Sequence, residues 1–365
     1  MLWVLFTATL VSLAVATLII RQSFAQDVVH SGPQQVHRHR VSRVGGIALV
    51  TGWVVGLGVA IFSNDQPWLN VLLWWLCVLP VFAVGLLEDM THKISPPWRL
   101  LAAGVSAMLA TWLLGAILPR LDLPLIDTAL ASWPLLALAL TWFAMAGVSH
   151  AFNIIDGYNG LSGMVALLVL GALGYVAFKV HDIELMLVCL ASIGAALGFL
   201  AWNYPRGLIF AGDGGAYFLG FIVALIAVLL VQRHAEVSAW FPLLLVIYPV
   251  WETVFSIYRR RASGRAAVMP DALHLHQMIY RRLVLWMVGS REARHLIERN
   301  AMTSPYLWGV AALSIVPAVF FWQSTPILIS FCLLFVMFYL WLYRRLVRFR
   351  APKWLITRSD STNRN

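Results

Sequence analysis

Residues 212–231 read GDGGAYFLGFIVALIAVLLV, and this stretch decides the fold class. From Gly215 to Val231 it is apolar and uncharged. That is close to the length of a membrane crossing, because a helix needs roughly 20 apolar residues to span a bilayer. Asp213 stands just before the run, among three glycines. The stretch therefore predicts a transmembrane helix with a single carboxylate at its mouth.

The composition of the whole chain extends this pattern. Of the 365 residues, 61% are hydrophobic and only 12% are charged, whereas a soluble globular domain carries about 45–50% apolar and roughly 25% charged residues. These values exclude a disordered chain, a soluble enzyme and a disulfide-stapled secreted domain. Cys77, Cys189 and Cys332 all lie in apolar runs, where we interpret them as packing residues. We predict an all-α, polytopic integral membrane protein with one domain over residues 1–365.

Apolar runs predict about eleven transmembrane helices. The runs lie at about 2–20, 45–63, 68–87, 100–118, 133–149, 160–178, 184–202, 215–231, 240–258, 306–322 and 326–343. Arg21 follows the first run and no basic residue precedes it. This order is the reverse of that in a signal peptide, so we expect an uncleaved first helix.

The loops between eleven spans differ sharply in charge from one side to the other. One side receives the tail and the loops at about 21–44, 88–99, 150–159, 203–214 and 259–305. That side carries 23 of the 26 Lys and Arg residues, and only Arg120, Lys179 and Arg233 fall on the other. Because cytoplasmic loops are enriched in Lys and Arg, we expect the N-terminus outside and the C-terminus in the cytoplasm. The net charge of +10 then reflects topology, and we expect no nucleic-acid partner.

Carboxylates and amides gather in two of the cytoplasmic loops. The third span ends in Glu88-Asp89, and Arg99 opens the next helix. Two adjacent carboxylates at the end of an apolar helix are costly unless a cation or a catalytic role is present, although a solvated helix end is the alternative. Asn153, Asp156 and Asn159 recur every three residues in the 150–160 loop. Oxygen donors at this spacing suit a hard cation or a nucleotide sugar, and an Asx-rich turn is the alternative.

Two glycine-containing loops suit phosphate groups. Arg43 precedes Gly45-Gly46 at the start of the second span, where backbone can approach a phosphate and a helix N-terminus favours an anion. In the 203–215 loop, Asp213 can be a metal ligand while the glycines let a diphosphate approach. The alternatives are a solvated basic flank for the first loop and a tight turn capped by Asp213 for the second.

The long 259–305 loop contains the sequence His274-Leu275-His276-Gln277 within a run of arginines. Two histidines without nearby cysteines are a weak zinc signal, and the arginines favour a diphosphate. Glu252, in the ninth span, is the one acid well inside a predicted span. We expect it to have a pairing role or to line a cavity, with a proton path as the alternative.

Together, in this order and on one face of the membrane, the motifs resemble the polyprenyl-phosphate N-acetylhexosamine-1-phosphate transferase family. The resemblance is strongest at Asn153-x-x-Asp156-Gly157-x-x-Gly160-Leu161 and at Phe210-x-Gly212-Asp213-x-Gly215. It implies that Asp213 is the principal metal ligand and that Glu88, Asp89 and Asp156 are catalytic. The substrate-binding residues that we predict with it are His37, Arg43, Arg99, Asn153, Asn159, Asn203, His274 and His276.

The chain departs from the family pattern at three positions. Glu88 replaces the first of two aspartates, Asn159 replaces an acid, and Gln277 replaces the last histidine of a His-x-His-His element. The last departure favours the undecaprenyl-phosphate N-acetylglucosamine-1-phosphate transferase branch over the phospho-N-acetylmuramoyl-pentapeptide transferase branch.

The resemblance implies transfer of N-acetylhexosamine-1-phosphate from a UDP-N-acetyl sugar to undecaprenyl phosphate, with release of UMP. It implies Mg²⁺ as cofactor, with Mn²⁺ as a substitute, and a site on the cytoplasmic face of a bacterial inner membrane. The product would be the first lipid-linked sugar of a surface glycan such as O-antigen, and we allow a homodimer. The alternatives are a transporter or flippase of a lipid-linked sugar and a non-catalytic sugar-nucleotide-binding protein.

Overall fold

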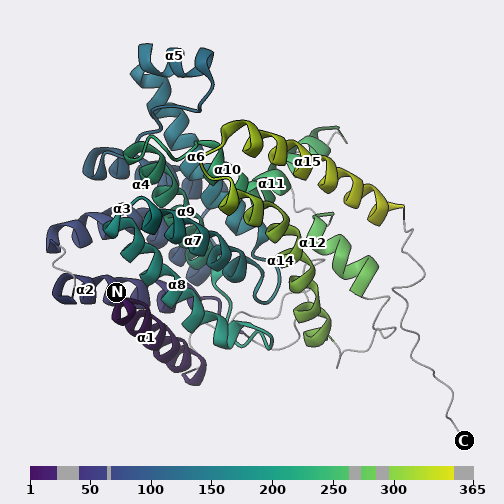
Figure 1. Ribbon diagram of the computed structural model, residues 1–365. Helices are drawn as coiled ribbons and strands as arrows, with labels where there is room; N and C mark the ends of the chain where they lie inside the picture. The colour runs from purple at the N-terminus through teal and green to yellow at the C-terminus, as the bar shows by residue number, and fades with distance from the viewer. Residues whose placement is uncertain (23–40, 64–66, 263–272, 285–295, 349–365) are drawn as a thin grey trace, which may run out of the picture.

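The computed structural model describes residues 1–22, 41–63, 67–262, 273–284 and 296–348. All named elements in this part of the chain are helices, and an isolated parallel bridge joins Ser42 to Ile209. The helices are α1 (Leu2–Arg21), α2 (Gly45–Ser63), α3 (Trp68–Thr91), α4 (Pro96–Leu114), α5 (Pro124–Ser132), α6 (Pro134–Ile155), α7 (Leu161–Lys179), α8 (Ile183–Asn203), α9 (Gly212–Arg233), α10 (Trp240–Leu245), α11 (Ile247–Ala262), α12 (Leu275–Met278), the π-helical turn η1 (Ile279–Val284), α14 (Leu296–Phe320) and α15 (Thr325–Val347). The all-α prediction is confirmed, and Figure 1 shows α5 standing out beyond the packed helices.

Ten helices in the described residues are long and apolar enough to cross a membrane. The predicted run at 240–258 is the exception, and the prediction of one continuous helix there is wrong. It is divided into α10 and α11 at Val246. Pro249 has no N–H to donate to the carbonyl of Leu245, and a proline inside a helix breaks or bends it for this reason.

The α10–α11 pair nevertheless runs along the bundle from one end to the other. Just before α10, the amide of Ser238 donates to the carbonyl of Trp322, next to the start of α15, at 3.1 Å. In the last turn of α11, Arg259 Nη1 donates to the hydroxyl of Tyr343, near the end of α15, at 2.6 Å. The pair therefore follows α15 along its length.

α9 forms the centre of the bundle. Every residue from Gly214 to Val231 is buried, and α2, α3, α6 and α7 pack against it. A helix that is apolar on all sides is expected to be enclosed in this way. At Gly220 the approach of α6 is so close that a Cβ atom would lie 2.7 Å from the Cα of Ser149. The stretch that predicted a membrane helix is thus the axis around which the others assemble.

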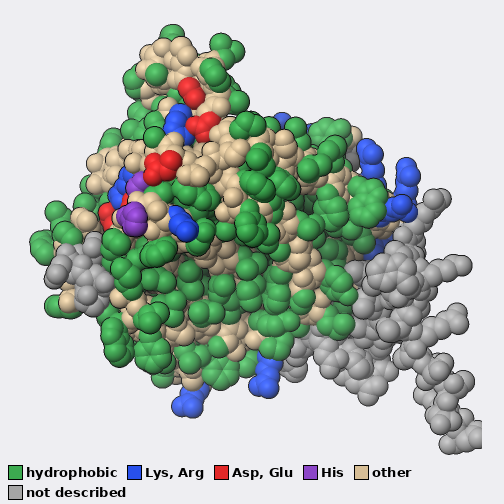
Figure 2. All heavy atoms as spheres, viewed as in Figure 1, with side chains coloured by type: hydrophobic (Ala, Val, Ile, Leu, Met, Phe, Trp, Pro, Cys, Tyr) green, Lys and Arg blue, Asp and Glu red, His purple; other side chains and the backbone are tan. Residues whose placement is uncertain are grey.

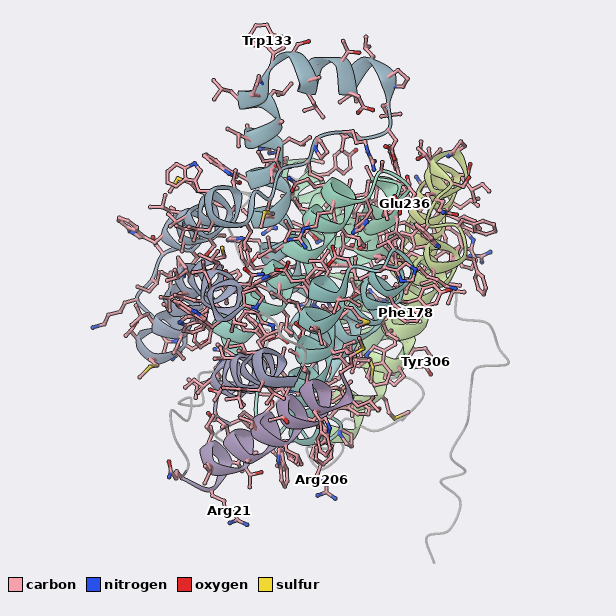
Figure 3. The ribbon with its side chains drawn as sticks, turned by 60° about the vertical axis from the view of Figure 1, so that its left-hand side comes forward. Arg21, Trp133, Phe178, Arg206, Glu236 and Tyr306 are labelled. Carbon is pink, nitrogen blue, oxygen red and sulfur yellow. The ribbon has the colours of Figure 1, made fainter. Side chains whose placement is uncertain are left out.

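The bundle has two ends, which we call the Asp213 end and the Arg233 end after the first and last turns of α9. Figure 3 shows Arg21 and Arg206 together at one end and Trp133 at the other. Arg206 lies in the loop that leads into α9, so this is the Asp213 end. Between the ends, hydrophobic side chains cover most of the face in Figure 2. Such a belt suits contact with lipid.

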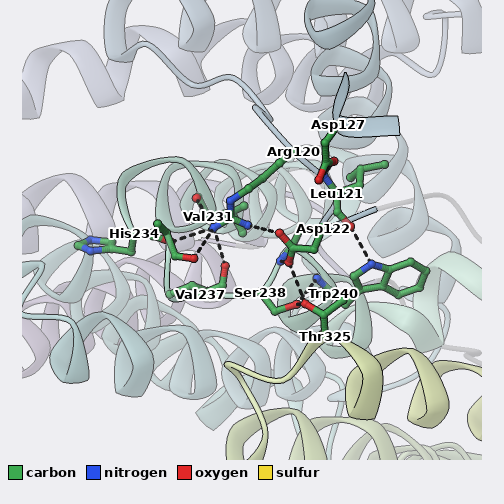
Figure 4. A network of polar contacts seen from close by, with 12 residues as sticks. Arg120, Leu121, Asp122, Asp127, Val231, His234, Val237, Ser238, Trp240 and Thr325 are labelled. Atoms are coloured by element: carbon green, nitrogen blue, oxygen red, sulfur yellow. Dashed lines mark hydrogen bonds and ion pairs between the residues drawn. The ribbon is translucent and has the colours of Figure 1, made fainter. Parts of the chain in front are cut away.

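The Arg233 end is closed by a polar network around Arg120 (Figure 4). Arg120 Nη1 pairs with Asp122 at 2.6 Å. Asp122 in turn accepts hydrogen bonds from the amide of Ala239 and the hydroxyl of Thr325 at 2.7 and 3.0 Å. Arg120 Nη2 donates to the carbonyls of Val231, His234, Ala235 and Val237. The network ties the segment after α4 to the chain that follows α9 and to the start of α15.

Candidate functional site

A carboxylate from α3 holds the first turn of α9. Asp89, in the last turn of α3, accepts from the amide of Asp213 at 2.7 Å and from the amide of Gly214 at 2.9 Å. It is only 7% exposed. Amides in the first turn of a helix lack partners within the helix, and the helix dipole favours negative charge there. Asp89 therefore fixes the position of α9 relative to α3.

Asp213 meets side chains from two further helix ends. Its Oδ1 accepts from Asn153 Nδ2, at the end of α6, at 2.9 Å. Its Oδ2 forms an ion pair with Arg99 Nη1, near the start of α4. Arg99 Nε is buried and has no hydrogen-bond partner among the described residues. An unmade buried hydrogen bond costs roughly 1–3 kcal/mol, so Arg99 keeps one donor whose satisfaction by an anion would be favourable.

Asp156 stands directly after α6 and accepts a hydrogen bond from the hydroxyl of Ser162, in the first turn of α7. Burial raises the pKa of Asp156 to about 6, against the lowering effects of the Ser162 hydrogen bond and of the positive charge of Arg43. The negative charge of Asp213 also raises this pKa. Arg43 and Asp213 therefore both lie near enough for their charges to act on Asp156, as expected for members of one site.

The glycines of the site serve the packing of chain segments. We expected Gly45-Gly46 and the glycines within 212–215 to make room for phosphate groups. Instead the amide of Gly45 donates to the carbonyl of Phe210 at 2.9 Å, and a Cβ on Gly46 would lie 2.5 Å from the nitrogen of Gly215. Protein backbone therefore fills the space on the Cβ side of these glycines, and the approach of a phosphate to them stays a prediction.

Asn159 and Asn203 brace two loops against each other. Asn203 Oδ1 accepts from the amide of Gly160 at 2.6 Å, and its Nδ2 donates to the carbonyl of Ile209 at 2.7 Å. Asn159 Nδ2 donates to the carbonyl of Pro205 at 2.9 Å. Both side chains are buried. The structure gives them partners within the protein, and their contact with substrate stays a prediction.

The two predicted histidines lie side by side but have different neighbours. Their rings stack at 5.2 Å between centroids. His274 Nδ1 lies 3.0 Å from Glu252 Oε1, which confirms the pairing role expected for Glu252. The ring of His276 lies 5.4 Å from that of Tyr158, in the turn that follows Asp156. His276 therefore contacts the turn next to Asp156, whereas His274 is linked to that turn only through His276.

Two predicted residues remain to be placed. Glu88 Oε2 accepts from the amide of Ile94 at 2.6 Å and closes the turn between α3 and α4. Its charge also acts on Arg99, so it borders the site, and its catalytic role stays a prediction. His37 lies outside the described residues.

The sequence reasoning missed Tyr217 and Ser162. Tyr217 lies close enough to Arg99 for the guanidinium charge to act on its hydroxyl. Its position four residues after Asp213 places it on the same helix face, which is a signal that the sequence did contain. Ser162 reaches Asp156 only because the chain turns between α6 and α7, and no helical spacing predicts that contact.

The donor set bears on the magnesium prediction. The described residues contain no group of three or more His, Cys, Asp or Glu side chains suited to hold a metal ion. Magnesium in phosphate-transfer sites commonly takes one or two carboxylates and fills its shell with water and substrate phosphate oxygens. Asp213, whose negative charge acts on the nearby Asp156, is a carboxylate of the kind that such a shared site uses.

Comparisons with known proteins match the part of the chain that carries most of the site. A family model described as glycosyl transferase family 4 matches residues 71–231, from α3 to α9. A protein of Bacillus subtilis (strain 168), described as a probable undecaprenyl-phosphate N-acetylglucosaminyl 1-phosphate transferase, is 24% identical over 281 residues, which cover 76% of each chain. An undecaprenyl-phosphate alpha-N-acetylglucosaminyl 1-phosphate transferase of Thermotoga maritima is 26% identical over 68% of this chain and 72% of its own. A phospho-N-acetylmuramoyl-pentapeptide-transferase of Vesicomyosocius okutanii is 28% identical over 59% of this chain and 67% of its own.

Proposed function

We propose, from the premise that this chain is one of the polyprenyl-phosphate N-acetylhexosamine-1-phosphate transferases, that it transfers a sugar-1-phosphate from a UDP-N-acetyl sugar to undecaprenyl phosphate. The names of the two undecaprenyl-phosphate relatives support this acceptor. The observation that carries the proposal is the junction of Asp213, Arg99 and Asn153. It is a polar cluster at one end of an apolar bundle, where a membrane lipid phosphate and a soluble nucleotide can meet.

The reaction exchanges one phosphoanhydride bond for another. An oxygen of the lipid phosphate attacks the phosphorus that carries the sugar. The bond from that phosphorus to the bridging oxygen of the diphosphate breaks, and UMP leaves with the electron pair of that bond. The product is a lipid-linked diphosphate sugar. Because both reactants are anions, the main tasks of the protein are positioning and charge neutralisation.

Arg99 is the residue best placed for charge neutralisation. It already faces a carboxylate, and its unpartnered Nε can donate to a phosphate oxygen. A guanidinium presents several donors in a fixed plane, which suits phosphate. The ion pair with Asp213 holds the side chain in place before substrate arrives.

Asp89 acts as a positioning group in this proposal. Both of its carboxylate oxygens accept amides of α9, so the carboxylate is occupied by the protein. The lipid phosphate needs little help from a base, because a phosphate monoester has a second pKa near 6 and is mostly a dianion at neutral pH.

Asp213, with Asp156, would hold Mg²⁺ or Mn²⁺ together with the diphosphate of the donor. When bound, the cation would withdraw negative charge from the diphosphate oxygens. Asn153 donates to Asp213 and keeps one of its oxygens oriented.

We place the Asp213 end on the cytoplasmic side of a bacterial inner membrane. The loops on that side carry most of the Lys and Arg residues, which is the distribution expected of cytoplasmic loops. UDP-sugars are soluble and reach a site there directly. The product would serve a cell-surface glycan such as O-antigen, and self-association as a homodimer stays a prediction.

The test is release of UMP by the purified protein. Undecaprenyl phosphate, Mg²⁺ and a panel of UDP-N-acetyl sugars are supplied in detergent or nanodiscs. We expect UMP from at least one donor, and Asp213→Asn should lose activity by several orders of magnitude. If folded wild-type protein releases no UMP from any donor, the transferase proposal fails. Transport of a lipid-linked sugar by reconstituted vesicles would then favour a flippase.

A further inference from the structure

Glu252 is a fully buried carboxylate that the proposed reaction does not use. It lies in α11, and its exposed area is zero. Oε1 lies 3.0 Å from His274 Nδ1 and accepts from the amide of Leu275 at 3.1 Å. Oε2 accepts from the hydroxyl of Tyr339 at 2.8 Å. A buried carboxylate is costly unless partners compensate it. Here His274 and Leu275 of one segment and Tyr339 of α15 do so.

The same place anchors the segment 273–284 to the bundle. The carbonyl of Leu273 accepts from Arg259 at 2.6 Å and from Tyr343 at 3.1 Å. Leu275 and Met278 of the segment are buried. Arg259 belongs to α11 and Tyr343 to α15. α11 and α15 therefore hold the segment 273–284, which carries the two histidines, against the bundle.

The hydrogen bonds around Glu252 also assign the tautomer of His274. Because an ionised carboxylate only accepts, the 3.0 Å contact between Nδ1 and Glu252 Oε1 favours the tautomer with its proton on Nδ1. Ser256 Oγ lies 3.0 Å from the same nitrogen and can share that proton. In the neutral ring Nε2 then carries the lone pair and is the nitrogen left to accept a hydrogen bond.

The His274 ring leads toward the carboxylate cluster. It stacks on His276 with an angle of 12° between the planes, and His276 contacts the turn formed by Gly157 and Tyr158. Glu252 is thus linked to the neighbourhood of Asp156 through two stacked imidazoles.

We propose that Glu252 is a positioning residue for the nucleotide-sugar donor, which it serves by holding His274 with its proton on Nδ1. This inference rests on the proposed transferase function. The ligand at Nε2 is a hydrogen-bond donor of the UDP-sugar, such as a hydroxyl group, since the fixed tautomer makes this nitrogen an acceptor. Glu252 itself does not touch the donor.

The test compares Glu252→Gln with Tyr339→Phe as a matched control. The glutamine keeps the shape and one acceptor, but its amide group presents N–H to Nδ1 and moves the imidazole proton to Nε2. The phenylalanine removes a hydrogen bond from the same carboxylate and leaves His274 as it is. We expect kcat/KM for the UDP-sugar to fall about tenfold to a hundredfold in the first, the range seen when a partner behind a ligating histidine is changed. We expect a change of about threefold or less in the second.

A double-mutant cycle decides whether Glu252 acts through His274. In a His274→Asn background, Glu252→Gln should have little further effect, because the group through which it acts is gone. An equal fall in kcat/KM in both backgrounds, or an equal fall in Glu252→Gln and Tyr339→Phe, would overturn the proposal. Should Glu252→Gln not fold, Glu252→Asp enters the same cycle, and the same additivity would overturn it. Absence of UMP release by wild-type protein is a different result and refutes the transferase function itself.

Discussion

Replacing Asp89 by Asn tests whether this residue is a brace for α9 or a base. The carboxylate accepts two amides with separate oxygens, at 2.7 and 2.9 Å, in a site that is 7% exposed. Asparagine offers one acceptor oxygen, so one of the two amides, of Asp213 or Gly214, must face an N–H group. The replacement also removes a negative charge from the amino terminus of a buried helix.

The cost follows from these losses. A hydrogen bond to a charged group contributes about 1.5–3 kcal/mol, and a charge at a helix terminus about 0.3–1 kcal/mol, more when it is partly buried. We expect Asp89→Asn to lower the free energy of unfolding by about 2–4 kcal/mol. It should also reduce kcat, because Asp213 shifts with the first turn of α9.

The assay is unfolding in mixed micelles with increasing SDS, followed by tryptophan fluorescence, alongside UMP release. Glu88→Gln is the matched control. The carboxylate of Glu88, next to Asp89 in the chain, accepts the single amide of Ile94, and the oxygen of a glutamine can still accept that amide. The control should unfold within about 1 kcal/mol of wild type. If Asp89→Asn is as stable as wild type yet inactive, the bracing argument is refuted and Asp89 is acting chemically.

Three further predictions concern other parts of the structure. Gly46→Ala should destabilise the protein by about 1–3 kcal/mol or prevent folding, since its Cβ would lie 2.5 Å from the nitrogen of Gly215. Gly58→Ala, whose Cβ would have nothing within 4 Å, should leave stability unchanged in the same unfolding assay. Equal effects of the two variants would contradict the packing role of Gly46. Asp156, with its pKa raised to about 6 by burial, loses its carboxylate form as the pH falls through 6, so wild-type kcat/KM should fall there. In Asp156→Asn the acidic limb should be shallower, with only the lipid phosphate titrating, and an unchanged profile would remove Asp156 from the reaction. Arg120→Gln should lower the free energy of unfolding by about 2–4 kcal/mol, because Asp122 loses its ion pair and several backbone carbonyls lose their hydrogen-bond donor. The KM for the UDP-sugar should not change. A changed KM would mean that the Arg233 end and the Asp213 end are coupled.

The sequence predicted what depends on local pattern. An apolar run such as 215–231 specifies a membrane helix by itself, and the charge difference between alternate loops requires only the order of the runs. Asp213, Arg99 and Asn153 were predicted members of one site and do meet. Each stands near the end of a helix, and these three helix ends lie on the same side of the bundle.

What the sequence could not specify depends on contacts between distant segments. A glycine pair indicates a close approach of backbone without naming the partner, and only the structure shows that Gly45 and Gly46 pack against residues of another loop. An asparagine between loops can bind substrate or brace the chain, and the partners of Asn203 lie in two separate segments. The charge of Glu252 was visible in the sequence, whereas its partner His274 became known only from the packing of the segment that follows α11.

The parallel pairing of the start of α2 with the loop before α9 sets an order of events during synthesis. The amides of Gly45 and Gly46 donate to the carbonyls of Phe210 and Ala211, which leave the ribosome long after α2 does. Until then the first turn of α2 and the carboxylate of Asp89 both lack their protein partners. The arrival of α9 satisfies both at once and fills the centre of the bundle. Among the described residues, a nascent chain halted before Gly212 therefore holds α1 to α8 but lacks Asp213, and the proposed site becomes complete only after α9 has joined them.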